Sequence, residues 1–203
     1  MKIDLHVHTK ERSSCSIASA EEHINQAIKM GLDAIVITDH DCMVEKDILD
    51  ELNDRYSPFK IFGGIELRIN ESGHDEDILV IGVHETELSE QKWTYRKLHE
   101  FVISKNGFIA LAHPYRYRDF VALDMKECSP HAIEIYSSNI GEDKKDMRLK
   151  LANELDCQLI TNSDGHSVDS IGKYYNHLNR TPNDEKELVE LLINGEYTTV
   201  VNV

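Results

Sequence analysis

The chain has 203 residues, of which 29% are charged and 40% hydrophobic. This composition is typical of globular proteins and excludes the disordered and fibrous classes. Acidic residues outnumber basic ones by 37 to 22, which gives a formal net charge of −15 at pH 7. Such a surface repels a phosphate backbone and disfavours, without ruling out, a nucleic-acid partner. The apolar runs are too short to cross a bilayer, so no membrane association is expected.

Cysteine usage bears on the cellular compartment. The four cysteines show no CxxC spacing, and the first predicted strand begins at Lys2, so we expect no signal peptide. The sequence therefore predicts a cytoplasmic protein with free thiols. Eleven histidines are present, and their positions carry the functional argument because histidine is the commonest metal ligand.

Short apolar segments alternate with helical segments along the chain. Strands are predicted at residues 3–7, 34–38, 60–67, 78–83, 108–112, 132–135, 158–161 and 197–201. Helices are predicted at residues 20–30, 44–53, 90–105, 143–155 and 184–192. The first helix shows the clearest limits, because Ser19 is a good N-cap and Gly31 a good terminator.

This order of elements indicates the fold class. Most strands are short and apolar on both faces, which is typical of parallel strands joined by helices. Seven or eight such units in 203 residues predict an α/β protein built as a small barrel. No linker or repeat divides the chain, so residues 1–203 are expected to form a single domain.

Residues of metal-ligand type follow the predicted strands. They are His6, His8, His40, Glu66, His113, Asp164 and His166. The carboxyl ends of the strands of a parallel barrel meet at one rim, so these side chains are expected to converge there. Each motif alone could be a polar strand end or a turn, but five motifs in register with five strand ends are not explained by packing. Nitrogen and carboxylate ligands suit Zn²⁺, Mn²⁺ or Fe²⁺.

With these motifs in place, the sequence resembles the polymerase-and-histidinol-phosphatase (PHP) family of metal-dependent phosphoesterases. The motifs that carry the resemblance are DLHVHT at 4–9, GLDAIVITDHD at 31–41, GGIEL at 63–67, ALAHPYR at 110–116 and NSDGH at 162–166. The resemblance implies a distorted seven-stranded β/α barrel with two or three divalent metal ions (Zn, Mn or Fe) in a cleft at its rim.

The resemblance also implies a division of the ligands among three metal ions. The first ion would take His6, His8, Glu66 and Asp164; the second Glu66, His113 and one further histidine; the third His40 and His166. The further histidine has no clear match. We favour His74, with Asp77 and His84 as alternatives.

The missing histidine of the second ion is one departure from the family pattern, and another concerns the third ion. Family members usually carry a His or Asp soon after the first motif, and residues 10–16 contain neither. Cys15 could stand in, but a buried inert thiol is the simpler interpretation, so the third site is expected to be weak, completed by water or empty.

The residues and the resemblance together predict hydrolysis of phosphate esters of a small metabolite or nucleotide by a metal-activated hydroxide. Arg116 directly follows the His113-Pro114 turn and is expected to bind the phosphate. Asp164 or His166 could relay the proton. Asp4 and Asp39 either orient the histidine ligands or are ordinary polar residues at strand ends.

Two other functions stay open at this point. One is an exonuclease that trims short oligonucleotides, with the segment 115–118 as the only place where tyrosines and arginines alternate. The other is a non-catalytic metal-binding module, which the missing third-site residue would favour. The substrate and the oligomeric state are left open by the sequence.

Overall fold

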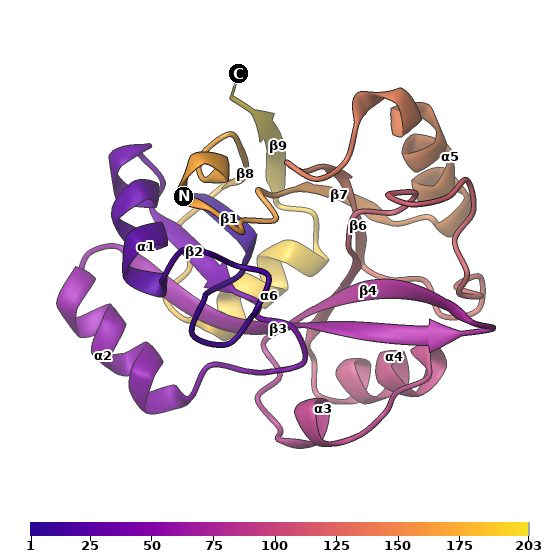
Figure 1. Ribbon diagram of the computed structural model, residues 1–203, viewed down its shortest axis with the longest axis horizontal. Coiled ribbons are helices and arrows are strands. Elements are labelled where there is room, and N and C mark those ends of the chain that lie inside the picture. The colour runs from indigo at the N-terminus through magenta and orange to yellow at the C-terminus, as the bar shows by residue number, and fades with distance from the viewer. Residues whose placement is uncertain (203) are drawn as a thin grey trace.

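The computed structural model describes residues 1–202, which form one strongly curved nine-stranded sheet with six α-helices packed against it (Figure 1). The strands are β1 (Lys2–Val7), β2 (Ala34–Ile37), β3 (Lys60–Glu71), β4 (His74–Ile81), β5 (Phe108–Leu111), β6 (Ala132–Tyr136), β7 (Gln158–Thr161), β8 (Tyr174–Leu178) and β9 (Tyr197–Val201). The helices are α1 (Ala20–Lys29), α2 (Lys46–Tyr56), α3 (Glu87–Glu90), α4 (Tyr95–Ser104), α5 (Lys145–Leu155) and α6 (Glu185–Ile193).

The strands follow the order β7-β6-β5-β4-β3-β2-β1-β8-β9. The pairs β1–β2, β2–β3, β5–β6 and β6–β7 are parallel, as predicted. The other four pairs are antiparallel, so the expectation of a wholly parallel barrel is wrong for them. Strand β8 was not predicted at all.

A tight turn explains the reversal at β3 and β4. Ser72 and Gly73 connect these strands, and both have positive φ angles, 55° and 78°. Two consecutive left-handed residues are the requirement of a short β-hairpin turn, which leaves no chain for a crossover helix. Glycine meets this requirement without strain, and the hairpin extends well beyond the rest of the sheet (Figure 1).

The sheet is nearly closed between its first and seventh strands. Val7 and Gly165 form a parallel bridge just beyond β7, and the His8 amide donates to the Gly165 carbonyl at 2.9 Å. At the end of β7, the buried side chain of Asn176 from β8 accepts a hydrogen bond from the Thr161 amide at 3.1 Å and donates one to the Thr161 carbonyl at 2.9 Å. The predicted distorted β/α barrel is therefore confirmed, with the β8–β9 hairpin inserted at the seam.

Three apolar clusters hold the elements together. Alternate residues of β5 face opposite sides, so that Ala110 packs with α6 while Ile109 packs with α4. Helix α6 fills the inner side with Leu188 and Leu192, which are fully buried. Helices α1 and α2 cover the outer side of β1 to β3. The barrel interior is thus filled by side chains at one end, and its polar residues are confined to the other end.

The structure can be compared with the expectations about the cysteines and about membrane-spanning segments. The four cysteines are free, as predicted, but Cys15 is exposed rather than buried because it lies in the surface loop between β1 and α1. Within residues 1–202, no helix has the length and apolarity needed to cross a membrane.

Candidate metal centre

His6 and His8 project from the end of β1 toward the same space. Their Nε2 atoms lie 2.9 Å apart, and both side chains are fully buried. Two residues separated by one position share a face of a strand, which is why an HxH motif at a strand end can present two ligands together. The prediction that both imidazoles share one face is confirmed.

Glu66 of β3 lies at the centre of the site. It is fully buried, and its Oε1 atom is 3.0 Å from His113 Nε2 and 3.3 Å from His6 Nε2. Its Oε2 atom is 3.2 Å from His8 Nε2 and 3.0 Å from His40 Nδ1. A carboxylate with two histidines at each oxygen occupies the position that a ligand shared between two metal ions requires.

Asp164 and His166 enter from the segment after β7. Asp164 Oδ1 lies 3.5 Å from His6 Nε2, 3.4 Å from His8 Nε2 and 3.3 Å from His166 Nδ1. Asp164 has a φ of 49° and His113 a φ of 29°, both in the left-handed region. This backbone costs about 1–3 kcal/mol at a residue other than glycine, and such strain concentrates at functional sites.

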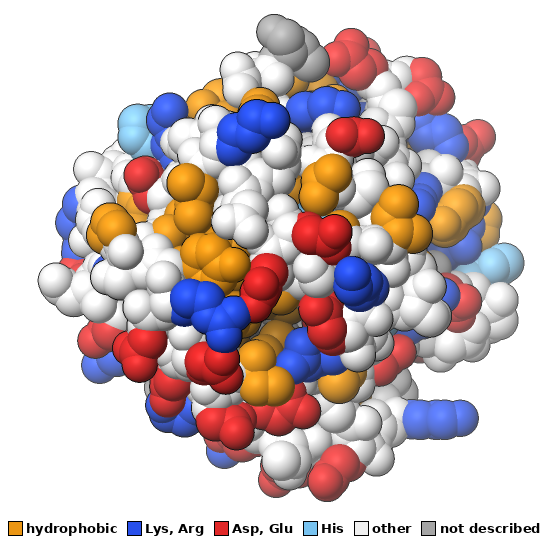
Figure 2. Space-filling view, turned by 60° about the vertical axis from the view of Figure 1, so that its left-hand side comes forward, with side chains coloured by type: hydrophobic (Ala, Val, Ile, Leu, Met, Phe, Trp, Pro, Cys, Tyr) orange, Lys and Arg blue, Asp and Glu red, His pale blue; other side chains and the backbone are white. Residues whose placement is uncertain are grey.

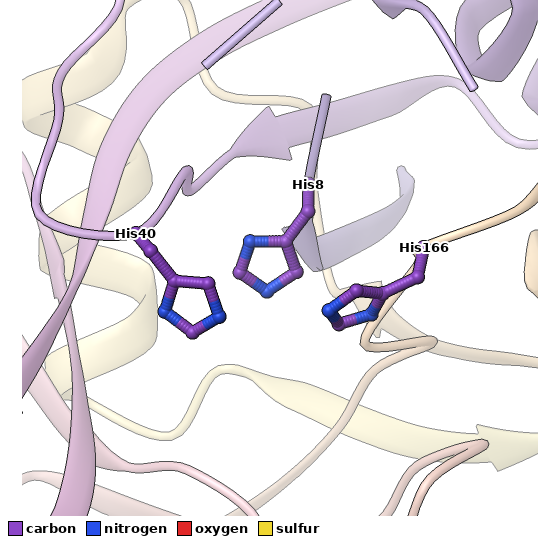
Figure 3. Close-up of side chains that lie close together, drawn as sticks. All are labelled: His8, His40 and His166. Carbon is purple, nitrogen blue, oxygen red and sulfur yellow. The ribbon is translucent and has the colours of Figure 1, made fainter. Parts of the chain in front are cut away.

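Four groups of three residues bring their donor atoms within 4.8 Å of one another. They are His6–His8–Glu66, His6–His113–Asp164, Glu66–Asp77–His113 and His8–His40–His166. Figure 3 shows the last group, in which the His8 ring lies between the other two, with centroid separations of 4.5 and 4.4 Å. The seven residues predicted to converge therefore do so.

The donor set fits divalent cations. Glu66 Oε2 and Asp164 Oδ1 are buried, and although histidine nitrogens lie 3.0–3.5 Å from them, none of these contacts within the described chain has the geometry of a hydrogen bond. Leaving a buried carboxylate oxygen without a partner is costly, so these atoms favour a positive charge at the point where the imidazoles meet. Nitrogen and oxygen donors without thiolate are those that Zn²⁺, Mn²⁺ and Fe²⁺ accept.

The same carboxylates attract protons. Burial disfavours the charged form of His113, but the hydrogen bond and charge of Glu66 outweigh it and raise the pKa of His113 to about 9. Burial likewise opposes the protonation of His6, yet the charges of Glu66, Glu134 and Asp164 hold its pKa well above the usual value. Protons and metal ions therefore compete for these imidazoles.

Glu134 of β6 contacts the donor set, although the sequence did not identify it as a site residue. It is fully buried, and its Oε1 atom lies 2.9 Å from His6 Nδ1. It also accepts hydrogen bonds from Asn162 Nδ2 at 2.7 Å and from the His113 amide at 2.9 Å. A carboxylate behind a histidine ligand fixes the direction of its ring. The signal in the sequence was a single acid inside the apolar segment AIEIY.

Asp4 and Asp39 hold backbone and hydroxyl groups rather than imidazoles. Asp4 accepts from the amides of His6 and Ser163, at 3.2 and 3.1 Å. Asp39 accepts from the Thr9 amide at 2.6 Å and from Ser13 Oγ at 2.7 Å. Both residues therefore fix the strand ends that carry the ligands.

Of the three candidates for the unmatched ligand, Asp77 is the one that the structure brings to Glu66 and His113. Its side chain is 7% exposed, and its Oδ2 atom lies 3.8 Å from His113 Nε2. His74, the favoured candidate, is not brought to the site; it is exposed at the hairpin tip and packs against Phe120. Asp77 lies three positions further along the extended strand, about 10 Å from His74. His84 is also remote from the donor set, and it forms an ion pair with Glu185 instead.

Arg116 lies beside the cluster, as predicted. Its Nη1 atom is 3.5 Å from Asp164 Oδ2, and its side chain is 26% exposed. A cavity of about 360 Å³ begins at His113 and Asp77 and is also lined by Arg116, Arg68 and Tyr117. A ligand in this cavity would contact both the donor set and the guanidinium groups.

Comparisons with known proteins agree with this arrangement. The sequence pattern of the PHP domain family matches residues 4–192. No curated protein matches the chain.

Several solved structures are similar. A two-domain protein from Bacteroides vulgatus that contains a predicted PHP-like metal-dependent phosphoesterase is 14% identical, with a TM-score of 0.73; the match covers 100% of this chain and 65% of that one. An amidohydrolase from Chromobacterium violaceum with bound sulfate is 15% identical, with a TM-score of 0.68, over 85% of this chain and 90% of that one. PsfC from Pseudomonas syringae is 15% identical, with a TM-score of 0.66, over 98% and 91%.

At identities of 14–15%, the structural likeness establishes the fold alone. The family is established by the sequence pattern, which spans nearly the whole described chain. This chain is shorter than the two-domain protein from Bacteroides and corresponds to about two thirds of it. From the match over residues 4–192, the chain belongs to the PHP domain family.

Proposed function

We propose that this protein is a metal-dependent hydrolase that cleaves phosphate esters of a small metabolite or nucleotide. The observation that carries the proposal is the set of four overlapping donor groups around buried Glu66, with Arg116 beside them. Two or three divalent ions, of Zn, Mn or Fe, are the cofactors that this set would hold. Bound there, they would lower the pKa of a water molecule and offset charge on phosphate oxygens.

The donor groups divide the roles among the residues. His6, His8, Glu66 and Asp164 would hold the first ion; Glu66, Asp77 and His113 the second; His40 and His166 the third. In this assignment Glu66 is shared between the first two ions, and Asp77 takes the place for which His74 was predicted.

Arg116 is the proposed phosphate contact. Its guanidinium lies at the edge of the donor set, and within residues 1–202 its only ion pair is the 3.5 Å contact with Asp164. A planar guanidinium suits two phosphate oxygens at once. The similar amidohydrolase from Chromobacterium has a bound sulfate, an anion with the tetrahedral shape of phosphate.

His166 and Asp164 are the proposed proton carriers. His166 is 24% exposed at the mouth of the site, and its Nδ1 atom lies 3.3 Å from Asp164 Oδ1. Burial lowers the pKa of His166 and so favours its neutral ring, which can accept a proton when no third ion is bound to it. Solvent access at this residue would let the proton leave.

Trimming of short oligonucleotides is the second candidate. Tyr117 is 75% exposed, and the Arg116 guanidinium lies 5.1 Å from the centre of its ring. Exposed aromatic rings beside arginines can stack nucleobases. Against this candidate, the chain has a net charge of −15, and acidic side chains lie among the basic ones on the face seen in Figure 2. A small phosphorylated substrate is therefore the favoured partner.

The test combines elemental analysis with phosphate release. Protein prepared without chelator should contain two or three Zn, Mn or Fe ions per chain and release phosphate from members of a panel of monoesters and short oligonucleotides. Glu66→Gln should lower kcat/KM by at least about 100-fold, because it removes the shared ligand. Glu127→Gln, an exposed carboxylate paired with Arg96, is the matched control. Release that survives Glu66→Gln would contradict the proposal.

A further inference from the structure

The carboxylate of Asp77 is already engaged by an arginine. Arg68 of β3 lies directly opposite Asp77 of β4 in the antiparallel hairpin. Its Nε atom donates to Asp77 Oδ1 at 2.8 Å, and its Nη2 atom donates to Oδ2 at 2.9 Å. This is the two-pronged geometry of a strong charge-assisted pair. Arg68 is 49% exposed, whereas Asp77 is 7% exposed.

Asp77 is also one of the three donors of the second group. Its carboxylate, Glu66 and His113 bring ligand atoms within 4.8 Å of one another. The Asp77 carboxylate can therefore bind either the guanidinium on the hairpin or a divalent cation in the donor set. Among the ligand carboxylates, Glu66 has no arginine contact in the described chain, and Asp164 has only the 3.5 Å contact with Arg116.

A fixed positive charge at this position opposes a second positive charge nearby. The guanidinium uses one acceptor site on each Asp77 oxygen and offsets the negative charge that would attract a metal ion. Half of the Arg68 side chain is in solvent, so it can leave Asp77 at little packing cost. The same cavity of about 360 Å³ is lined by Arg68, Asp77 and Arg116, so an anion there offers Arg68 another partner.

From this geometry we infer that Arg68 controls the Glu66–Asp77–His113 site by competing with the metal ion for Asp77. In the free protein this site is the weaker one of the pair that shares Glu66. A phosphate group in the cavity draws the guanidinium away from Asp77 and thereby strengthens metal binding. By reciprocity, a metal ion on Asp77 frees Arg68 to bind the phosphate. The inference rests on the proposed metal centre.

Titration with Mn²⁺, with free ion measured by electron paramagnetic resonance, tests the inference without an activity assay. In Arg68→Gln, the Mn²⁺ ion whose binding is lost in Asp77→Asn should bind about tenfold more tightly than in the unchanged protein, without phosphate present. Inorganic phosphate should strengthen that step in the unchanged protein and have a smaller effect in Arg68→Gln. Arg96→Gln removes the same charge from an exposed pair and should leave the affinity within about twofold.

Two further variants make the result specific. Asp77→Asn should lose one Mn²⁺ ion, and Arg68→Gln combined with Asp77→Asn should behave like Asp77→Asn alone. Circular dichroism at each step shows that the variants are folded. Unchanged or weaker binding in Arg68→Gln, while the unchanged protein binds two or more ions, overturns this inference alone. Absence of Mn²⁺ binding in both proteins overturns the proposed function as well.

Discussion

Glu134 shows how a residue that would touch neither metal nor substrate can determine the metal centre. Its Oε1 atom accepts from His6 Nδ1 and Asn162, while Oε2 accepts from the His113 amide. With its Nδ1 proton held by Glu134, His6 presents the lone pair of Nε2 to the donor set. Glu134 therefore fixes both the ring direction and the tautomer of a ligand.

Glu134→Gln should weaken binding of the most tightly held metal ion by about 10- to 100-fold. The change keeps the shape of the side chain but removes the negative charge that makes His6 a better ligand. Metal titration of the folded protein measures the effect, with Glu127→Gln as a control for the loss of one carboxylate. An unchanged affinity would show that Asn162 and the strand backbone are enough to hold His6 in place.

At the scale of elements, the seam between β7 and β8 depends on one side chain. Asn176 is fully buried and bonds the Thr161 amide and carbonyl, and its Nδ2 atom also donates to Asn162 Oδ1 at 2.9 Å. Asn162 in turn accepts from the Leu5 amide at 3.1 Å. The side chain thus connects β8, β7 and β1 where no regular backbone ladder joins β7 to β8.

Asn176→Ala should lower the free energy of unfolding by about 2–4 kcal/mol, since it leaves buried backbone groups of Thr161 without partners. Urea unfolding followed by circular dichroism measures this loss. Asn194→Ala, at an exposed position at the end of α6, should change stability by less than about 0.5 kcal/mol. A similarly small effect at Asn176 would mean that the bridge between Val7 and Gly165 closes the barrel alone.

At the scale of the whole molecule, the rim concentrates buried charge in a protein that is already acidic. Glu66, Asp77, Glu134 and Asp164 are all buried within this one region, in a chain of net charge −15. The histidines between them offset part of this charge by holding protons. Bound divalent ions would do so more fully, so metal content and global stability are linked.

Chelation should therefore lower the melting temperature by about 10 °C at pH 8. The difference should shrink toward about pH 6. The pKa of His113, raised to about 9, keeps this ring protonated at lower pH, and a metal ion must displace that proton. Scanning calorimetry with and without metal at several pH values measures both effects. A difference that is independent of pH would contradict competition at His113, and Glu66→Gln should remove most of the difference.

The sequence alone determined the alternation of strands and helices, the barrel and most of the candidate ligands. Metal-ligand residues that directly follow apolar strands, such as His8 and His40, can be recognised because local order along the chain fixes both the strand and its end. The HxH spacing is also local, so its consequence could be derived without a fold.

Only the tertiary structure decided which residue completes the second group. Reasoning from parallel strands places ligands after the apolar part of each strand, but β4 runs antiparallel to its neighbours. Its beginning, not its end, therefore lies at the rim, which brings Asp77 to Glu66 and leaves His84 remote. Glu134 was hidden for a related reason: its partners His6 and Asn162 come from strands far apart in sequence, and only barrel closure brings them together.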